Sequence, residues 1–188
     1  MNRKNFFVPM VVFLMLLTVA PVLAFPTHWQ KAPAWNTTTG VVSSAPPVYS
    51  WTTKDGITIE IGVQSDVTGQ LGIGTTTYAL YSHSVFNLVY DSKTSMADRY
   101  SDATWYVTAM TTGPLKGASD GFSGVVIILY NGATSLNPAN GSPVGTTSYS
   151  VQLKLQGFGE FKGQTLMISY DGPAVKTAKW TGYCLIPT

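Results

Sequence analysis

Histidine and serine side chains could support nucleophilic catalysis if one histidine activated a neighbouring serine. Such catalysis needs a nucleophile, a base and a third group that orients the base. The chain has two histidines, His28 in a proline-rich segment and His83 between Ser82 and Ser84. These serines lack the Gly-x-Ser-x-Gly pattern of a nucleophile elbow. We therefore interpret His83 as a structural or surface residue. The sequence identifies no catalytic residue and leaves enzymatic activity open, with a non-enzymatic role favoured.

The carboxylates are scattered in a way that favours neither a metal site nor a glycosidase pair. Metal binding needs clusters of His, Cys, Asp and Glu, and the nearest approach, Asp91, Asp98 and Asp102, has the spacing of no calcium loop. Glu60 and Glu160 are the only glutamates. The pattern places Glu60 on the outward face of a strand and Glu160 in a turn, so we expect both to be solvated. We expect no metal and no cofactor.

Cys184 is the only cysteine, so no disulfide can form within the chain. It lies on the last predicted strand, with no histidine near it in the sequence to activate a thiolate. We interpret it as a small buried apolar residue. An intermolecular disulfide is the alternative.

Aromatic side chains are the remaining candidates for a binding site. Trp105, Tyr106 and Trp180 could line a pocket for a small apolar ligand, because aromatic rings offer large apolar faces. The same residues could instead fill the core and its rim. We take these three as the candidate ligand-binding residues.

Short strands joined by glycine-containing turns must position these side chains. Residues 57–63, 104–111 and 149–155 alternate apolar and polar side chains with period two, which predicts strands with one buried face. Residues 125–130 are apolar on both faces, as in a central strand that is covered on both sides. We predict a turn cluster over 65–74 and a loop or short helix over 92–101. This gives about eight strands and no long helix.

A near-repeat in the second half of the chain indicates how these strands are arranged. The pattern Phe122-x-Gly124 to Tyr130-x-Gly132 recurs as Phe161-x-Gly163 to Tyr170-x-Gly172. Glycines at 124, 163 and 182 fall in predicted strands, where glycine is tolerated if the sheet bends or another backbone approaches closely. The predicted fold is therefore all-β, a single antiparallel barrel of about eight strands, with a β-sandwich as the alternative.

The end of the chain resembles a group of small secreted β-barrels, the allene-oxide-cyclase-like and dirigent-like proteins. The resemblance rests on Gly157-Phe158-Gly159-Glu160-Phe161-Lys162-Gly163, then Tyr170-Asp171-Gly172, then Trp180-Thr181-Gly182-Tyr183, and covers at most residues 121–183. It implies an eight-stranded barrel. It transfers no activity, because none of the catalytic or ligand residues of either family can be placed on this chain.

The first residues predict export. A basic start at Arg3 and Lys4 precedes the apolar residues 6–20, and Ala24 closes the segment at a small-residue cleavage site. We predict a signal peptide over 1–24 and hence a secreted or cell-surface protein. An uncleaved membrane anchor is the alternative, since residues 6–24 form a stretch of 19 residues, which is long enough to span a bilayer.

Residues 25–47 contain four prolines and no periodicity, so we predict an N-terminal tether there and a barrel domain over 48–188. Asn36-Thr37-Thr38 matches the N-glycosylation pattern. The net charge of +2 falls to 0 without Arg3 and Lys4, so no basic stripe remains to bind nucleic acid.

Three functions remain open. The first is an exported, non-enzymatic β-barrel that binds a small apolar ligand or a surface partner. The second is a cyclase- or isomerase-like enzyme that uses the barrel cavity, and the third is a structural component of the cell surface. A hollow interior would favour a ligand, polar side chains converging inside would favour an enzyme, and an open edge strand or exposed apolar patch would favour a structural role.

Overall fold

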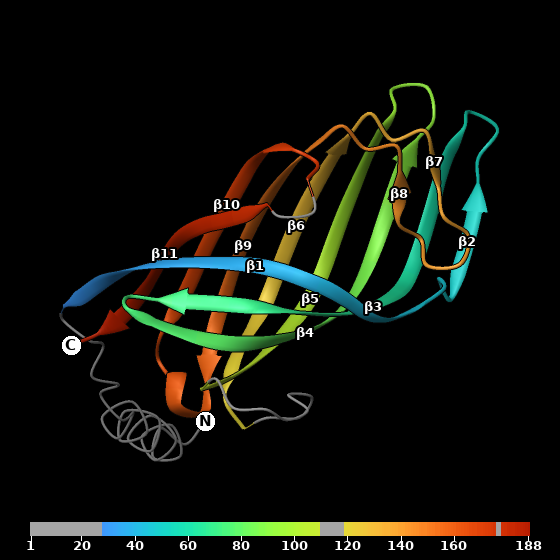
Figure 1. The fold of residues 1–188 in the computed structure, drawn as a ribbon. Coiled ribbons are helices and arrows are strands. Elements are labelled where there is room, and N and C mark those ends of the chain that lie inside the picture. Colours follow the sequence, from blue (N-terminus) through green and yellow to red (C-terminus); the bar gives the residue numbers. More distant parts are fainter. Residues whose placement is uncertain (1–27, 110–118, 176–177) are drawn as a thin grey trace, which may run out of the picture.

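The computed structural model describes residues 28–109, 119–175 and 178–188 and shows a closed antiparallel β-barrel of eight strands, with one extra strand outside the ring (Figure 1). The ring runs β1-β11-β10-β9-β6-β5-β4-β3 and closes through a second pairing of β1 with β3. The ring strands are β1 (Trp29–Ala45), β3 (Ile57–Ile73), β4 (Thr76–Asp91), β5 (Met96–Ala109), β6 (Gly121–Asn131), β9 (Ser148–Phe158), β10 (Thr165–Pro173) and β11 (Lys179–Pro187). The predicted barrel is confirmed.

The remaining elements are short. The extra strand β2 (Tyr49–Thr52) pairs only with the first part of β3. A two-stranded hairpin of β7 (Ser135–Leu136) and β8 (Pro143–Val144) lies in the connection from β6 to β9. A 3-10 helix (Gly159–Phe161) follows β9.

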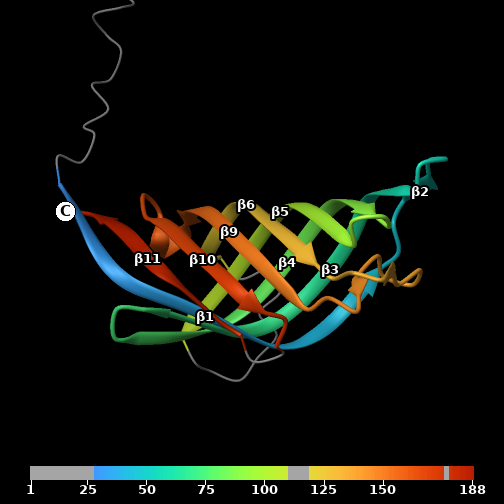
Figure 2. The same ribbon diagram turned by 90° about the horizontal axis from the view of Figure 1, so that it is seen from above.

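The predicted tether is wrong for most of its length, because residues 29–45 form β1, the strand that closes the barrel. The first part of β1 pairs with β11, and residues 34–45 pair with the second part of β3. Figure 2 shows β1 crossing obliquely between these two neighbours. Two register shifts, between Thr38 and Gly40 and between Val41 and Ser43, interrupt its alternation. These irregularities explain why no period is visible in the sequence.

Strand β3 corrects two further predictions. Its register with β4 shifts between Glu60 and Val63, where Gly62 has a φ of 75°. A bulge of this kind reverses which residues face inward, so Glu60 is buried, at 4% exposure, instead of lying on the outward face. The predicted turn cluster over 65–74 is strand up to Ile73.

Strands β5 and β6 also differ from expectation. The predicted loop over 92–101 is a tight turn, and β5 already begins at Met96. Residues 125–130 are not covered on both faces, since Val125 is 48% exposed on the outer surface. The apolar outer face of β6 therefore contacts solvent.

Two groups of buried side chains stabilise the fold. The larger fills the barrel and includes Leu71, Phe122, Leu155 and Leu166. The smaller joins the projecting parts of β3, β4 and β5 to the β6–β9 connection, and its members are Val63, Phe86, Leu88, Tyr90, Ala97 and Ala133. The connection thereby covers the inner face of the sheet where the strands extend beyond the ring.

Gly182 has the predicted role of allowing another backbone to approach its own strand closely. A Cβ at Gly182 would collide with the carbonyl oxygen of Met167 on β10. Gly124 lies within β6 as predicted, whereas Gly163 lies in the turn after the 3-10 helix and not in a strand.

The predicted signal peptide over 1–24 lies outside the described residues and stays a prediction. Within the described ranges, no helix is both long enough and apolar enough to cross a membrane.

Candidate functional site

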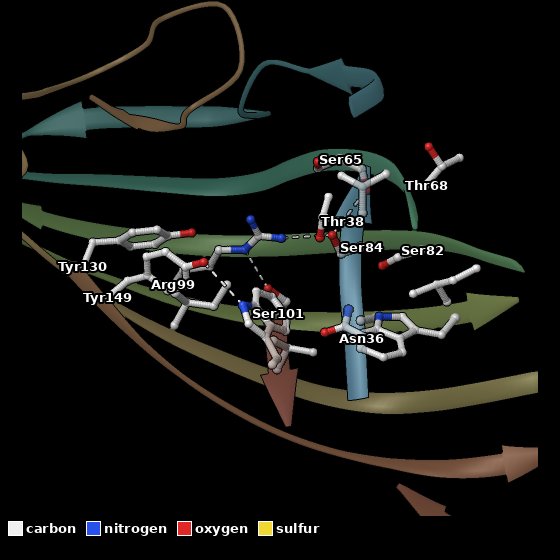
Figure 3. A pocket seen from close by; sticks show the side chains of 17 residues that line it. Asn36, Thr38, Ser65, Thr68, Ser82, Ser84, Arg99, Ser101, Tyr130 and Tyr149 are labelled. Carbon is white, nitrogen blue, oxygen red and sulfur yellow. Dashed lines mark hydrogen bonds between the residues drawn. The ribbon is translucent and has the colours of Figure 1, made fainter. Parts of the chain in front are cut away.

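A cavity of about 250 Å³ lies inside the barrel and is the candidate functional site (Figure 3). Its walls come from β1, β3, β4, β5, β6, β9 and β11. Leu80, Trp105, Val126 and Ile128 give it apolar sides. An eight-stranded barrel can hold one small ligand when its interior side chains leave space, and the volume is just below that of common small-molecule pockets, about 300–1,000 Å³.

Two of the three candidate ligand-binding residues line the cavity. Trp105 is 3% exposed and points inward from β5, and Trp180 contributes from β11. Tyr106 follows Trp105 on the same strand and therefore faces the other way. Its ring packs instead with those of Tyr81 and Phe158, at centroid distances of 6.3 and 6.2 Å. The structure thus brings Trp105 and Trp180 together and leaves Tyr106 outside.

Tyrosine side chains complete one side of the cavity. The indole nitrogen of Trp180 donates a hydrogen bond of 3.3 Å to the Tyr149 hydroxyl. The Tyr149 ring lies 6.2 Å from that of Tyr130, which also lines the cavity. Burial raises the pKa of Tyr149, so its hydroxyl stays protonated at neutral pH.

Arg99 places a positive charge in the cavity wall. Its Nε donates to the Ser101 hydroxyl at 2.9 Å and its Nη2 donates to the Ser84 hydroxyl at 3.0 Å (Figure 3). The guanidinium carbon lies 3.7 Å from the centre of the Phe86 ring. Within the described part of the chain, no carboxylate lies at ion-pair distance from Arg99. Two neutral hydroxyls and an aromatic face therefore hold this cation.

Asn36 contributes a second polar group from β1. Its side chain lines the cavity and is 3% exposed, and its Oδ1 has no hydrogen-bond partner among the described residues. Asn36-Thr37-Thr38, which matches the N-glycosylation pattern, therefore places its asparagine inside the barrel. A glycan on a side chain inside the barrel is incompatible with this fold.

Glu60 lies close to the β6–β9 connection. A Cβ at Gly141 would collide with its Oε2, which has no hydrogen-bond partner in the described ranges. Burial raises the pKa of Glu60, because the charged carboxylate is poorly solvated there. This glutamate is not among the residues that line the cavity.

His83 belongs to a polar cluster on the outer face. Its Nδ1 lies 2.6 Å from Asp66 Oδ1, and the Ser43 hydroxyl donates to Asp66 Oδ2 at 2.6 Å. Because Ser43 bonds to the aspartate and not to the histidine, the three residues lack the order of a catalytic triad. Burial opposes ionisation of Asp66, but hydrogen bonds from Ser43, His83 and Tyr81 outweigh it and lower its pKa to about 2.

Cys184 lies inside the barrel wall, fully buried. Its thiol donates a hydrogen bond of 3.3 Å to Gln164 Oε1, and burial raises its pKa to about 11. These properties are those of an unreactive structural thiol. In the described residues no three His, Cys, Asp or Glu side chains are grouped so that they could hold a metal ion.

Comparison with known proteins gives no relative for this chain: no family model matches, and no similar curated protein or solved structure is found. The resemblance to allene-oxide-cyclase-like and dirigent-like barrels stays an expectation. The site must therefore be interpreted from its own geometry.

Sequence reasoning missed Arg99 and Asn36, the two polar residues of the cavity that carry most chemical information. Arg99 lies in residues 92–101, for which the sequence predicts a loop or short helix, and Asn36 lies in the predicted tether. A period-two pattern was present for Arg99, since Ala97, Ser101 and Ala103 share its inward face. No comparable signal exists for Asn36, because the alternation of β1 is broken.

Proposed function

We propose that this protein is an exported, non-enzymatic β-barrel that binds a small, largely apolar molecule in its interior cavity. The observation that carries the proposal is the hollow of about 250 Å³ with aromatic and aliphatic walls. Protein interiors are normally packed to the density of organic crystals, so an interior space of this size is unusual. Export rests on the basic and apolar start of the chain.

The side chains around the cavity favour binding over proton-transfer chemistry. None of the described residues that line it is a histidine, an aspartate or a glutamate. The remaining titratable groups there are Arg99, Tyr130 and Tyr149, and burial keeps the Tyr149 hydroxyl protonated. A general base that works near neutral pH is therefore absent from the described lining.

The experiment that tests this proposal fills the cavity with a larger side chain. We expect Ala103→Phe, which adds a ring inside the barrel, to abolish binding of the neutral probe 3-phenylpropanamide, measured by isothermal titration calorimetry. Ala103 is buried and lines the cavity. Asp102→Phe is the matched control, because Asp102 is exposed on the other face of β5. Binding that persists in a folded Ala103→Phe protein, or no binding by the unmodified chain, would overturn the proposal.

A cyclase- or isomerase-like activity is the second candidate, because polar groups converge inside the barrel. Arg99, Ser84 and Ser101 are hydrogen-bonded together at the cavity wall. In such an enzyme the aromatic walls would hold a reactive substrate in one shape, and Arg99 would stabilise developing negative charge. A small molecule that the purified protein rearranges, and that Arg99→Gln no longer rearranges, would favour this candidate.

A surface role is supported by strand β2. It is the last strand of the sheet and pairs only with β3, and Val48, Tyr49 and Trp51 on and beside it are exposed. An edge strand with apolar side chains can pair with a partner chain. If it mediates self-association, Trp51→Lys should convert an oligomer to a monomer in sedimentation velocity.

A further inference from the structure

We propose that the ligand of the cavity carries a carboxylate, and that the Arg99 guanidinium binds it inside the barrel. This inference rests on the proposed ligand-binding function and adds the chemical class of the ligand. It concerns a mostly apolar acid small enough for a cavity of about 250 Å³.

Arg99 carries a full charge whose binding capacity is only partly used. A guanidinium has five N–H donors and stays protonated in proteins. The structure gives Arg99 two hydrogen bonds, to Ser101 and Ser84, and both acceptors are neutral hydroxyls. Donors therefore remain that could bind both oxygens of a carboxylate, which the planar fork matches in shape.

Among the described residues, the barrel offers Arg99 no counterion. Glu60 is the nearest inward acid by register, since Glu60 pairs with Leu88 and Leu88 pairs with Arg99 on three adjacent strands. The Glu60 carboxyl group and the Arg99 guanidinium nevertheless form no ion pair. The buried position of Glu60 favours its neutral form, which makes it a poor counterion. Arg99 is half-buried, so water solvates its charge only in part, and an anionic ligand would supply the missing counterion.

The other residues that line the cavity indicate the chemistry of the part of the ligand that Arg99 does not bind. Trp105 and Trp180 offer aromatic surface for an apolar body. Asn36 Oδ1, on β1, is buried without a hydrogen-bond partner in the part of the chain that the structure describes, and it could accept a hydrogen bond from a ligand hydroxyl or amide. Arg99 and Asn36, both labelled in Figure 3, line the same cavity. These groups fit a small organic acid better than an inorganic anion.

The test compares an acid with its neutral isostere. Binding of 3-phenylpropanoate and 3-phenylpropanamide to the full chain is measured by isothermal titration calorimetry at neutral pH. We expect the acid to bind about tenfold more tightly than the amide, since charge-assisted hydrogen bonds are roughly twice as strong as neutral ones. Inorganic phosphate serves as the third probe and should bind more weakly than the acid.

Arg99→Gln should weaken binding of the acid about tenfold and leave binding of the amide unchanged. Arg99→Lys keeps the positive charge but loses the planar fork of donors. The ratio of the affinity for the acid to that for the amide should therefore fall but stay above one. Lys162→Gln is the matched control, because it removes an exposed positive charge that is not part of the cavity lining, and it should leave the preference intact. Thermal unfolding checks that each variant is folded.

The outcomes separate this inference from the proposed function. Equal affinity for acid and amide in the unmodified chain, or a preference for the acid that survives in Arg99→Gln, overturns the carboxylate inference and leaves cavity binding intact. Phosphate that binds as tightly as the acid also overturns it, because the apolar body would then contribute nothing. If neither organic probe binds, the proposed function itself is wrong.

Discussion

Arg99 and Asp66 are charged residues on opposite faces of the barrel wall, and they differ in how their charge is balanced. Asp66 accepts hydrogen bonds from Ser43 and His83 on the outer face. Arg99 lies on the inner face with only neutral acceptors. The first arrangement is complete within the protein and stabilises the fold, whereas the second leaves donors for a ligand.

The acid stability of the protein should depend on Asp66. Its pKa of about 2 lies below the ordinary value of 3.8, so between these values the folded state binds fewer protons than the unfolded state. The stabilisation is therefore full above 3.8 and is lost as the pH falls toward 2. We expect Asp66→Asn to lower the free energy of unfolding at neutral pH by about 1–2 kcal/mol.

Urea unfolding over a pH series measures this effect. Asp66→Asn should also flatten the fall in stability at acid pH. Asp102→Asn is the control, since Asp102 is exposed on the outer face of β5. An Asp66→Asn protein as stable as the unmodified chain at every pH would show that the outer polar cluster contributes nothing.

Glu60 should have the opposite pH dependence. Burial raises its pKa above 4.5, so above this pH the folded state holds a proton that the unfolded state has released. Its contribution to stability is full below 4.5 and is lost as the pH rises through the raised value. We expect Glu60→Gln to increase the free energy of unfolding at neutral pH. Glu160→Gln is the control, since Glu160 is exposed, and it should leave the free energy of unfolding unchanged. A loss of stability in Glu60→Gln would contradict the raised pKa of Glu60.

Cys184 should be protected from thiol reagents in the folded protein. Its thiol is fully buried and its pKa is raised to about 11 by burial, so little reactive thiolate forms. Titration with Ellman's reagent should show no free thiol under native conditions and one thiol in denaturant. Rapid labelling of the native protein would mean that β11 opens readily.

At the residue level the sequence singled out two aromatic residues of the cavity lining, Trp105 and Trp180, but none of its polar residues. Trp105 and Trp180 could be singled out because large aromatic residues on alternating strands face the interior. Tyr106 could be separated from Trp105 only by fixing which face of β5 is inward. Arg99 was missed because a charged residue is normally expected in solvent.

At the level of elements, strands with an uninterrupted alternation were predictable and strands with bulges were not. Strand β9 alternates buried and exposed residues from Val151 to Gln156, as its sequence predicts. Strand β3 changes its inward set at the bulge near Gly62, so a fixed period assigns Glu60 to the wrong face. Strand β1 has two such shifts, and the pairings that define it come from strands distant in the sequence.

The pairing of β1 with β3, which closes the barrel, should be destabilised by a single methyl group at Gly69. A Cβ there would collide with the carbonyl oxygen of Thr37 on the facing strand. We expect Gly69→Ala to lower the free energy of unfolding by about 1–3 kcal/mol, because the backbones would have to separate. Chemical denaturation measures this difference.

Gly40→Ala is the matched control for Gly69→Ala in the pairing of β1 with β3. Gly40 is paired with Thr68, directly beside the Gly69 pairing, and a Cβ there would make only ordinary contact with the Thr68 hydroxyl. The free energy of unfolding of the Gly40→Ala variant should stay close to that of the unmodified chain. Equal stability of the two variants would argue against close approach of β1 and β3, and hence against closure of the barrel there.

At the level of the whole molecule, closure of the ring creates the cavity. Strand β1 supplies Asn36 and the last strand supplies Trp180, while Arg99 and Trp105 come from the middle of the chain. These residues share a site only because β1 joins β11 to β3. The in-strand glycines and the near-repeat could predict closure, but the volume left inside depends on side chains from most strands of the ring at once.

The most direct test of the account locates a bound molecule relative to the tryptophans. Intermolecular NOEs are measured between the ring protons of 3-phenylpropanoate and the indole protons of the labelled protein. We expect NOEs to Trp105 and Trp180, which line the cavity, and none to Trp29 or Trp51, which are exposed outside it. NOEs confined to Trp29 or Trp51, or no NOE to any tryptophan, would contradict ligand binding inside the barrel.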